Sequence, residues 1–473
     1  MLAYYTYYIT RITMKIKAEE MYATMNPWRL FFIVAIPGMV SMFAMSIYAI
    51  VEGIFIGQIL GEGAFAAVNI AMPLVMINFS LADLIGVGAS APISIALGKN
   101  DHKTANNIFS SSIIMIFLTS IIMGAIMFSA AEPLSRFMGA DDTLLDTSVK
   151  YLRTYAICSP LSTIFFAMDN YLRISGFVKT SMAINICSNL LTLALLAFFL
   201  LGCNMDVVGS AIATSISMCI CSLVAMIPFI AKKALLKFTK PKLSVSMIKQ
   251  IAACGSPVFL SNISGRIASV FMNISLMTLG VKALGAGGGQ TAIAVYAIIM
   301  YAGDLCWPLL YGIADSFAPA LGYNWGSKNY GRVKSIAKCA FIGTAIVGLV
   351  STSILFFFPG QIASWFVKAG EIKLLEISTR AIRIFCLAYL LRWVAVTTQS
   401  YFSAIEKPLE ATIMSVSMSV IFPVLLLGAL WNFGLDGIWF NFVGETILAA
   451  ILSVFLLIKL KKEIKKREKS DQQ

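Results

Sequence analysis

Eight charged side chains lie within long apolar stretches of this 473-residue sequence, where each would be costly to bury in hydrocarbon. A carboxylate in such a place can bind a proton or a cation, and a guanidinium can neutralise a carboxylate. Charged residues within membrane spans often mark the path of an ion or substrate, although some only form structural ion pairs or reach the interface. The eight residues are Glu52, Asp83, Asp169, Arg266, Asp304, Asp315, Arg392 and Glu445.

Three polar residues of the predicted seventh span share one helical face. Asn262, Arg266 and Asn273 are separated by 4 and 7 residues, which are spacings along one side of an α-helix. A lone arginine is tolerated in a membrane only if it is paired or hydrated. Because the next span carries Asp304, we expect Arg266 to pair with Asp304 or to share a water-filled face with it.

Other polar residues follow the same helical spacing. Asp304 and Asp315 lie 11 residues apart, about three turns, and Arg392 and Gln399 also share a face. In the first half of the chain, Asp83 lies deep in the second predicted span. These faces either line a water-filled cavity or pair with one another. The residues predicted to line a substrate cavity are Asp83, Asn262, Arg266, Asn273, Asp304 and Gln399.

Motifs of soluble enzymes and of metal centres are absent from the sequence. It contains no P-loop, which argues against ATP-driven pumping, and no GxSxG or HExxH motif. The nine cysteines form no CxxC pair, and the only histidine, His102, has no ligand partner nearby in the sequence. We therefore expect no catalytic residues, no cofactor and no metal centre built from histidine and cysteine ligands.

Membrane-spanning helices are the elements that must position these residues. The sequence is 59% hydrophobic and 12% charged, with a mean hydropathy of +0.84, whereas a soluble chain has about twice that charged fraction. Apolar runs of about 20 residues recur, each long enough to cross the membrane, and the alternation of a β-barrel does not appear. The twelve predicted spans lie at about 30–51, 65–97, 105–130, 150–171, 180–202, 207–231, 251–279, 290–322, 335–358, 378–404, 408–431 and 437–459.

Lysine and arginine residues determine the expected orientation. They are concentrated in the loops on the same side as the N-terminus, above all 232–249, and in the tail 459–469. Both termini are therefore predicted to lie in the cytosol, with the chain in the cytoplasmic (inner) membrane. This distribution explains the net charge of +13, and no nucleic-acid motif is present, so no nucleic acid is expected as a partner.

An internal repeat divides the chain into two halves. AIPGMVS around Pro37 resembles GSPVFLS around Pro257, and ALGKNDHKTA resembles YNWGSKNYGR, with Gly98 opposite Gly326. With six spans per half, the repeats are parallel and related by an axis along the membrane normal. The predicted parts are a leader at 1–29, an N-lobe at 30–231, a linker at 232–250, a C-lobe at 251–459 and a basic tail at 460–473. Met14 or Met25 could be the true start.

The segment PGMVSMFAMSIYAIVEGIFIGQILGEGAFAAVNIAMP, which begins at Pro37, resembles the first span and turn of the multidrug and toxic compound extrusion (MATE) family. The resemblance continues through PISIALGKND, MGADD, NYLRISGFVK and VVGSAIAT and covers about residues 27–460. It is to the MepA-type bacterial branch rather than to the NorM branch. It implies two six-helix bundles that open outward and export organic cations against Na⁺ or H⁺.

The resemblance also implies a cation site in the N-lobe. The family joins an acidic residue on span one to polar residues on span five, and Glu52, Asn185 and Asn189 match these positions. Glu52 stands where the family usually has aspartate. The acids that NorM-type members carry on spans seven and ten are missing here, so a C-lobe cation site of that kind is not expected. Pro37, which lacks a backbone donor, is the predicted bending point of span one.

The leading interpretation is a secondary antiporter, not an enzyme, that exports amphipathic, often cationic drugs or toxic metabolites by alternating access in exchange for H⁺ or Na⁺. An alternative is a flippase for lipids or lipid-linked saccharides, whose cavity would be strongly cationic, whereas acidic and basic residues are mixed here. A membrane-embedded enzyme or a channel is less favoured. The protein is predicted to be monomeric and to contact membrane lipids.

Single cysteines can test the predicted orientation. Cysteines that replace Asp142 or Lys368 should react with a membrane-impermeant maleimide in intact cells, because these loops are predicted to lie outside. Cysteines that replace Lys103 or Lys240 should react only after permeabilisation. Labelling of the 232–249 segment from outside would contradict the orientation.

Overall fold

A computed structural model of the chain describes residues 18–367 and 370–470, apart from the side chains of residues 57, 58 and 62. The described residues form helices and contain no strand, which confirms the predicted all-α fold. Most of the predicted leader lies outside the described residues, as do Met14, Lys368 and the last three residues of the basic tail.

Contacts divide the chain into two compact units. Unit 1 runs to Gly255 and includes Gly322–Ser327, and unit 2 comprises Ser256–Leu321 and the chain from Lys328 onward. The helices before the division are α2 (Ala18–Ala23), α3 (Pro27–Gly98), α4 (His102–Ser129), α5 (Ala131–Phe137), α6 (Leu145–Ser162), α7 (Ile164–Ile174), α8 (Val178–Ala197) and α9 (Val207–Ile230). The helices from the division onward are α10 (Val245–Leu284), α11 (Gly288–Asp304), α12 (Trp307–Ser316), α13 (Ala318–Gly326), α14 (Tyr330–Phe357), α15 (Pro359–Ser364), α16 (Ile372–Phe385), α17 (Tyr389–Ala404), α18 (Pro408–Val416), α19 (Phe422–Ala429) and α20 (Gly434–Ser470).

Eleven helical segments of the described chain are long and apolar enough to cross a membrane. They coincide with eleven of the twelve predicted spans. The remaining span is divided between α6 and α7, and α6 begins with charged residues such as Asp146, Lys150 and Arg153. Together they supply the sixth segment of the first half, so each half contributes six segments to an all-α membrane fold.

The first spanning helix continues directly into the second. Backbone hydrogen bonds join both into α3, and only Gly61 (φ 83°, ψ 177°) leaves the helical conformation within it. Such a positive φ is accessible to glycine and strained for other residues. Pro37 lies within a continuous part of α3. The break between predicted spans one and two is therefore at Gly61, and bending at Pro37 stays a prediction.

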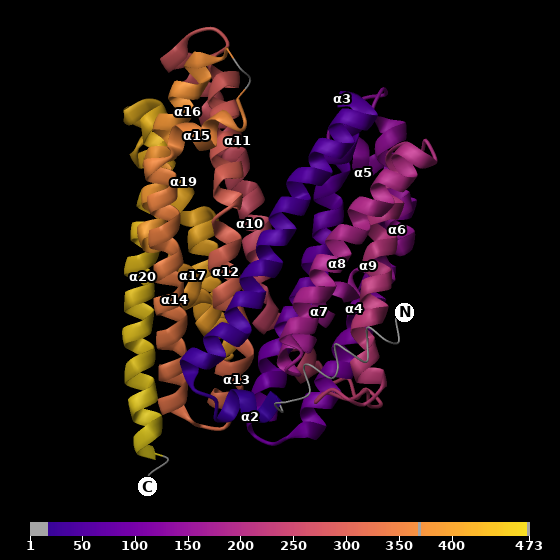
Figure 1. Cartoon of the computed structure of the whole chain (residues 1–473), viewed down its shortest axis with the longest axis vertical. Helices are drawn as coiled ribbons and strands as arrows, with labels where there is room; N and C mark the ends of the chain where they lie inside the picture. Colours follow the sequence, from indigo (N-terminus) through magenta and orange to yellow (C-terminus); the bar gives the residue numbers. More distant parts are fainter. Residues whose placement is uncertain (1–17, 368–369, 471–473) are drawn as a thin grey trace. The chain divides into compact units, whose positions relative to one another are not determined.

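Within unit 1, α3 packs against α4, α6, α7 and α8, and α9 packs against α6 and α8 (Figure 1). Hydroxyl groups join these helices: Ser112 bonds Tyr171 at 2.6 Å, and Ser120 bonds Thr163 at 2.7 Å. Small hydroxyl side chains let helices approach closely and replace hydrogen bonds that lipid cannot provide. The close packing positions polar residues of α3, α7, α8 and α9 inside the unit.

Within unit 2, α17 packs against α12, α14 and α20 (Figure 1). The hydroxyl groups of Thr344 on α14 and Thr397 on α17 lie 2.7 Å apart. Because α17 touches all three neighbours, a polar residue on it can meet partners from α12 and α20. Arg392, on α17, is such a residue.

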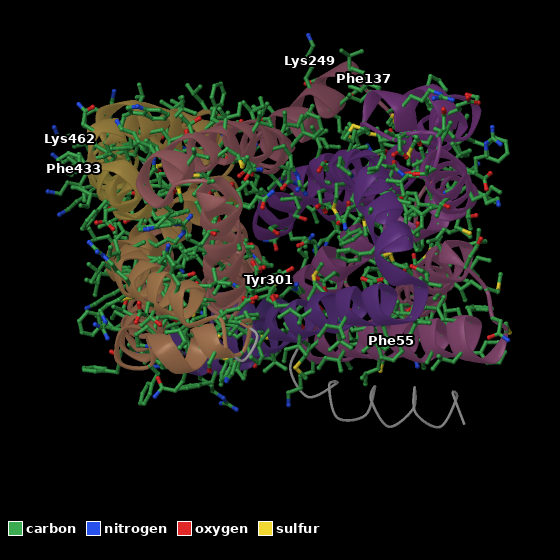
Figure 2. All side chains as sticks on the ribbon, turned by 90° about the horizontal axis from the view of Figure 1, so that it is seen from above. Phe55, Phe137, Lys249, Tyr301, Phe433 and Lys462 are labelled. Atoms are coloured by element: carbon green, nitrogen blue, oxygen red, sulfur yellow. The ribbon has the colours of Figure 1, made fainter. Side chains whose placement is uncertain are left out.

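Large apolar side chains cover much of the molecular surface. Phe137 is 86% exposed and Phe433 is 68% exposed, and both point outward in Figure 2. Exposed phenylalanine, isoleucine and leucine recur along the spanning helices. In water such a surface would promote association, whereas in a bilayer it is the expected lipid-facing surface.

The segment between α9 and α10 is attached to unit 1 by two asparagines of α4. Asn107 accepts a hydrogen bond from the backbone N–H of Lys242 at 2.7 Å, and its amide donates to the Lys242 carbonyl at 3.1 Å. Asn106 accepts from the N–H of Lys237 at 2.8 Å. These bonds fix part of the predicted linker, residues 232–250, against α4. The predicted bounds of the linker and of the two lobes stay predictions.

Two glycines of unit 1 lie where the backbones of α3 and α10 nearly touch. A Cβ added to Gly88 would lie 2.2 Å from the carbonyl oxygen of Ile251, and one added to Gly255 would lie 1.8 Å from that of Leu84. Real Cβ atoms do not approach backbone this closely. The helix crossing therefore requires glycine at both positions.

Replacing Gly88 by alanine should force α3 and α10 apart and destabilise the protein by about 1–3 kcal/mol, as other overpacking substitutions do. The matched control is Gly265→Ala in α10, where a Cβ meets nothing within 4 Å and alanine should be neutral or slightly stabilising. Thermal unfolding of the purified variants measures both. Equal melting temperatures for the two variants would contradict the close crossing.

Candidate functional site

Glu52 of α3 is held by hydroxyl groups within unit 1. Thr214 of α9 donates a hydrogen bond from Oγ1 to Glu52 Oε1 at 3.3 Å. Tyr48, one helical turn before Glu52, bonds the same carboxylate. The buried Tyr151 of α6 lies near Glu52. Glu52 is therefore half-buried, and its partners are neutral hydroxyl groups of α3 and α9.

The two asparagines predicted to serve Glu52 have other surroundings. Asn185 donates from Nδ2 to Asp169 Oδ1 at 2.7 Å. The Nδ2 of Asn189, one turn further along α8, is buried and has no hydrogen-bond partner among the described residues. Within the described chain, no hydrogen bond joins either asparagine to Glu52. Their shared role with Glu52 stays a prediction, and the structure adds Tyr48 and Thr214, which the sequence reasoning missed.

Asp169 is the centre of a second polar cluster in unit 1. It forms an ion pair with Arg173, four residues later on α7, and it also accepts a hydrogen bond from Ser181 of α8. Arg173 is 5% exposed and donates from Nε to Ser181 Oγ at 3.3 Å. Asp83 of α3 is close enough for its charge to interact with that of Asp169. Asp83 is thus a second carboxylate near Asp169, whereas the ion pair of Arg173 is with Asp169.

The Asp169 cluster also contacts the short N-terminal helix. The hydroxyl of Tyr22 on α2 donates to the backbone carbonyl of Arg173, and the Tyr22 carbonyl accepts from Asn324 Nδ2 at 2.9 Å. Tyr22 is only 2% exposed. Arg173 lies two residues beyond the predicted span at about 150–171 but belongs to α7. The i,i+4 spacing of Asp169 and Arg173 was the available signal for their pairing.

The predicted pairing of Arg266 with Asp304 is not found. No ion pair within 4.0 Å joins these residues in the described chain, and both side chains are exposed. Asn262 and Asn273 are exposed as well, which agrees with one shared face of α10. Because Arg266 on α10 and Asp304 on α11 are both exposed, they do not form a buried ion pair. A shared aqueous face, and the cavity role of these residues and of the half-buried Gln399, stay predictions.

The buried arginine of unit 2 is instead Arg392. Its Nη2 lies 3.4 Å from Glu445 Oε1, and both side chains are 5% exposed. The guanidinium carbon stands 3.3 Å from the centroid of the Trp307 ring. Nearby on the same unit, Ser400 donates to Asp315 Oδ1 at 2.8 Å. The internal cation of this unit is therefore held by α12 and α20, and the sequence reasoning did not identify Trp307.

In the part of the chain that the structure describes, the clusters around Glu52, Asp169 and Arg392 do not contain a set of ligands for a multi-ligand metal centre. Among the described residues, no group of three or more histidine, cysteine, aspartate or glutamate side chains could hold a metal ion. A single carboxylate with hydroxyl neighbours, as at Glu52, can bind a proton or contribute to a monovalent cation site.

The Asp169–Arg173 pair should contribute strongly to stability. Asp169→Ala leaves Arg173 buried without its counter-charge, and breaking such a pair costs about 3–5 kcal/mol. Asp146→Ala breaks the Asp146–Lys150 pair, which has the same i,i+4 spacing but is exposed, so no measurable change is expected. Thermal unfolding compares the two variants, and an equal, small loss in both would show that Asp169 is not buried with its partner.

The MatE family profile matches residues 37–199 and 257–427, which together are more than half of the chain. The two matched segments correspond to the two halves of six spanning segments. Both the Glu52 pocket and the Asp169 cluster draw residues from the first segment, and Trp307 and Arg392 lie in the second.

Individual relatives agree with this match. The chain is 26% identical over 430 residues to the multidrug export protein MepA of Staphylococcus saprophyticus, covering 89% of this chain and 92% of the relative. It is 26% identical over 435 residues to MepA of Staphylococcus haemolyticus, covering 91% and 93%.

Among solved structures, the fold is similar to an outward-facing multidrug resistance MATE family transporter of the MOP superfamily. The TM-score is 0.87 at 23% identity, covering 96% of this chain and 100% of that one. A MOP superfamily transporter from Pyrococcus furiosus gives a TM-score of 0.87 at 22% identity, covering 95% and 99%. Family profile, relatives and fold agree, and the chain belongs to the MatE family, the multidrug and toxic compound extrusion proteins.

Proposed function

We propose that the protein is a secondary antiporter that exports amphipathic, often cationic drugs or toxic compounds in exchange for H⁺ or Na⁺. The observation that carries this proposal is Glu52, a carboxylate inside a helix bundle with hydroxyl groups as its partners. Relatives over most of the chain are named multidrug export proteins, which favours drug export over lipid flipping and over chemical conversion.

Antiport requires that two ligands compete for one site or favour different states of the protein. The Glu52 carboxylate can be neutralised by a proton, by Na⁺ or by an organic cation, but not by all of them together. Tyr48 and Thr214 can donate hydrogen bonds to the ionised carboxylate and can turn their hydroxyl oxygens toward a bound cation. Binding of the coupling ion would thus release the exported cation, and alternating access would make the exchange directional.

The contacts around Glu52 favour H⁺ over Na⁺. Sodium needs several oxygen ligands, whereas one proton is enough to neutralise one carboxylate. The hydroxyl of Thr214 lies 3.3 Å from Glu52 Oε1 and 3.2 Å from the carbonyl of Ser210, and its one hydrogen can be donated to only one of these two acceptors at a time. Asn185 and Asn189 remain the proposed additional ligands should Na⁺ couple.

The proposed setting follows from the same reasoning. The chain would span the cytoplasmic membrane many times with both termini in the cytosol, and would act as a monomer surrounded by lipid. Asp83, Asn262, Arg266, Asn273, Asp304 and Gln399 are the proposed cavity residues.

Removing the charge of Glu52 tests the proposal. In proteoliposomes, Glu52→Gln should reduce gradient-driven efflux of a fluorescent cationic dye to the background of empty liposomes, because glutamine neither binds nor releases a proton. Proton and sodium gradients are imposed separately, so the wild-type response identifies the coupling ion.

The control is Glu132→Gln, which removes an exposed carboxylate of α5 that pairs with Arg136. It should transport like the wild type. Efflux in Glu52→Gln that matches the wild type, with the same dependence on the ion gradient, would contradict the assignment of Glu52.

A further inference from the structure

The buried guanidinium of Arg392 lies between an aromatic ring and a carboxylate, all within unit 2. Its carbon Cζ is 3.3 Å from the centroid of the Trp307 ring, and Nη2 is 3.4 Å from Glu445 Oε1. The uncharged side chains of Tyr311 and Tyr296 lie near Glu445. Three different helices, α12, α17 and α20, supply Trp307, Arg392 and Glu445.

Trp307 and Glu445 together have the chemistry of a site for an organic cation. The face of an indole ring attracts positive charge, and a carboxylate at its side supplies the counter-charge. The distance of 3.3 Å from Cζ to the ring centroid is the spacing of a flat group stacked on the ring. A guanidinium or an amidinium is planar and delocalised and can stack in this way while its edge donates to a carboxylate.

Arg392 satisfies this site only in part. A guanidinium carries five N–H donors, yet the Nε and Nη1 of Arg392 are buried and lack hydrogen-bond partners among the described residues. A group selected only to neutralise Glu445 would be expected to use more of its donors, because a buried donor without a partner is costly. The ring also keeps a partner of its own, since Trp307 hydrogen-bonds Tyr389. Trp307 and Glu445 therefore both contact a cation, whereas Arg392 leaves two of its nitrogen atoms without a hydrogen-bond partner among the described residues.

We propose that Trp307 and Glu445 form a binding site for planar organic cations and that Arg392 occupies it as an internal ligand. The inference rests on the proposed function, because the external ligand would be a guanidinium or amidinium group of an exported compound. Such a compound binds by displacing Arg392, so Arg392 lowers the affinity of the site. Arg392 is thus a residue that determines specificity, and the opposing interpretation is a purely structural counter-ion for Glu445.

Binding of benzamidine to the purified full-length protein in lipid nanodiscs tests the proposal without transport. In Arg392→Met the apolar stem is kept and the charge is lost, so benzamidine should bind at least tenfold more tightly than to the wild type. Benzamide, the neutral analogue of the same shape, should gain nothing. Adding Trp307→Leu or Glu445→Gln to Arg392→Met should abolish the gain.

The matched control is Arg380→Met, which removes an arginine that also pairs with an acidic residue of unit 2, Asp436, but is 69% exposed. It should leave benzamidine affinity unchanged. An affinity in Arg392→Met that equals or falls below that of the wild type would overturn the proposal and leave Arg392 as a structural counter-ion.

If little folded Arg392→Met is recovered, its yield becomes the measurement. Benzamidine added during purification should restore the yield, because it replaces the lost cation beside Glu445, whereas benzamide should not. Equal yields with either compound would overturn the proposal. A tenfold gain in binding without dye efflux in the wild type would contradict the proposed antiport and leave the cation site standing.

Discussion

Charges inside a bilayer must be neutralised by the protein itself, because hydrocarbon cannot solvate them. In unit 1 the buried Arg173 pairs with the half-buried Asp169, and in unit 2 the buried Glu445 pairs with the buried Arg392. Glu52 differs, since its partners among the described residues are the neutral hydroxyls of Tyr48 and Thr214. A carboxylate without an internal counter-cation can be neutralised by a proton or a mobile cation, and for this reason we propose that ion coupling takes place at Glu52.

The two halves share a helical layout but treat their cations differently. In unit 1 the partners of Glu52 among the described residues are hydroxyl groups, whereas in unit 2 Arg392 lies between Trp307 and Glu445. We therefore propose different chemistry for the two sites: ion exchange at Glu52, and selection of planar cations by Trp307 and Glu445.

Spanning segments were predictable because about 20 apolar residues are needed to cross a membrane, and this length is visible in the sequence. Helical faces were also visible, as the exposed positions Asn262, Arg266 and Asn273 show. The hydrogen-bond and ion-pair partners of these residues were not predictable, because they depend on how the helices are rotated about their axes against one another. Thr214 lies 162 residues from Glu52, and Arg392 lies 53 residues from Glu445. For the same reason Arg266 and Asp304, adjacent by span order, form no ion pair.

The central claim is that Glu52 exchanges a coupling ion for an organic cation, and ion release on substrate binding tests it most directly. A cationic substrate is added to the purified protein in weakly buffered detergent solution, and the pH of the medium is followed. The account predicts that the wild type releases protons in proportion to bound substrate and that Glu52→Gln releases none while it remains folded. Equal proton release from both proteins would contradict this claim. So would a wild type that releases no protons at any sodium concentration, if Glu52→Gln binds the substrate as tightly as the wild type does.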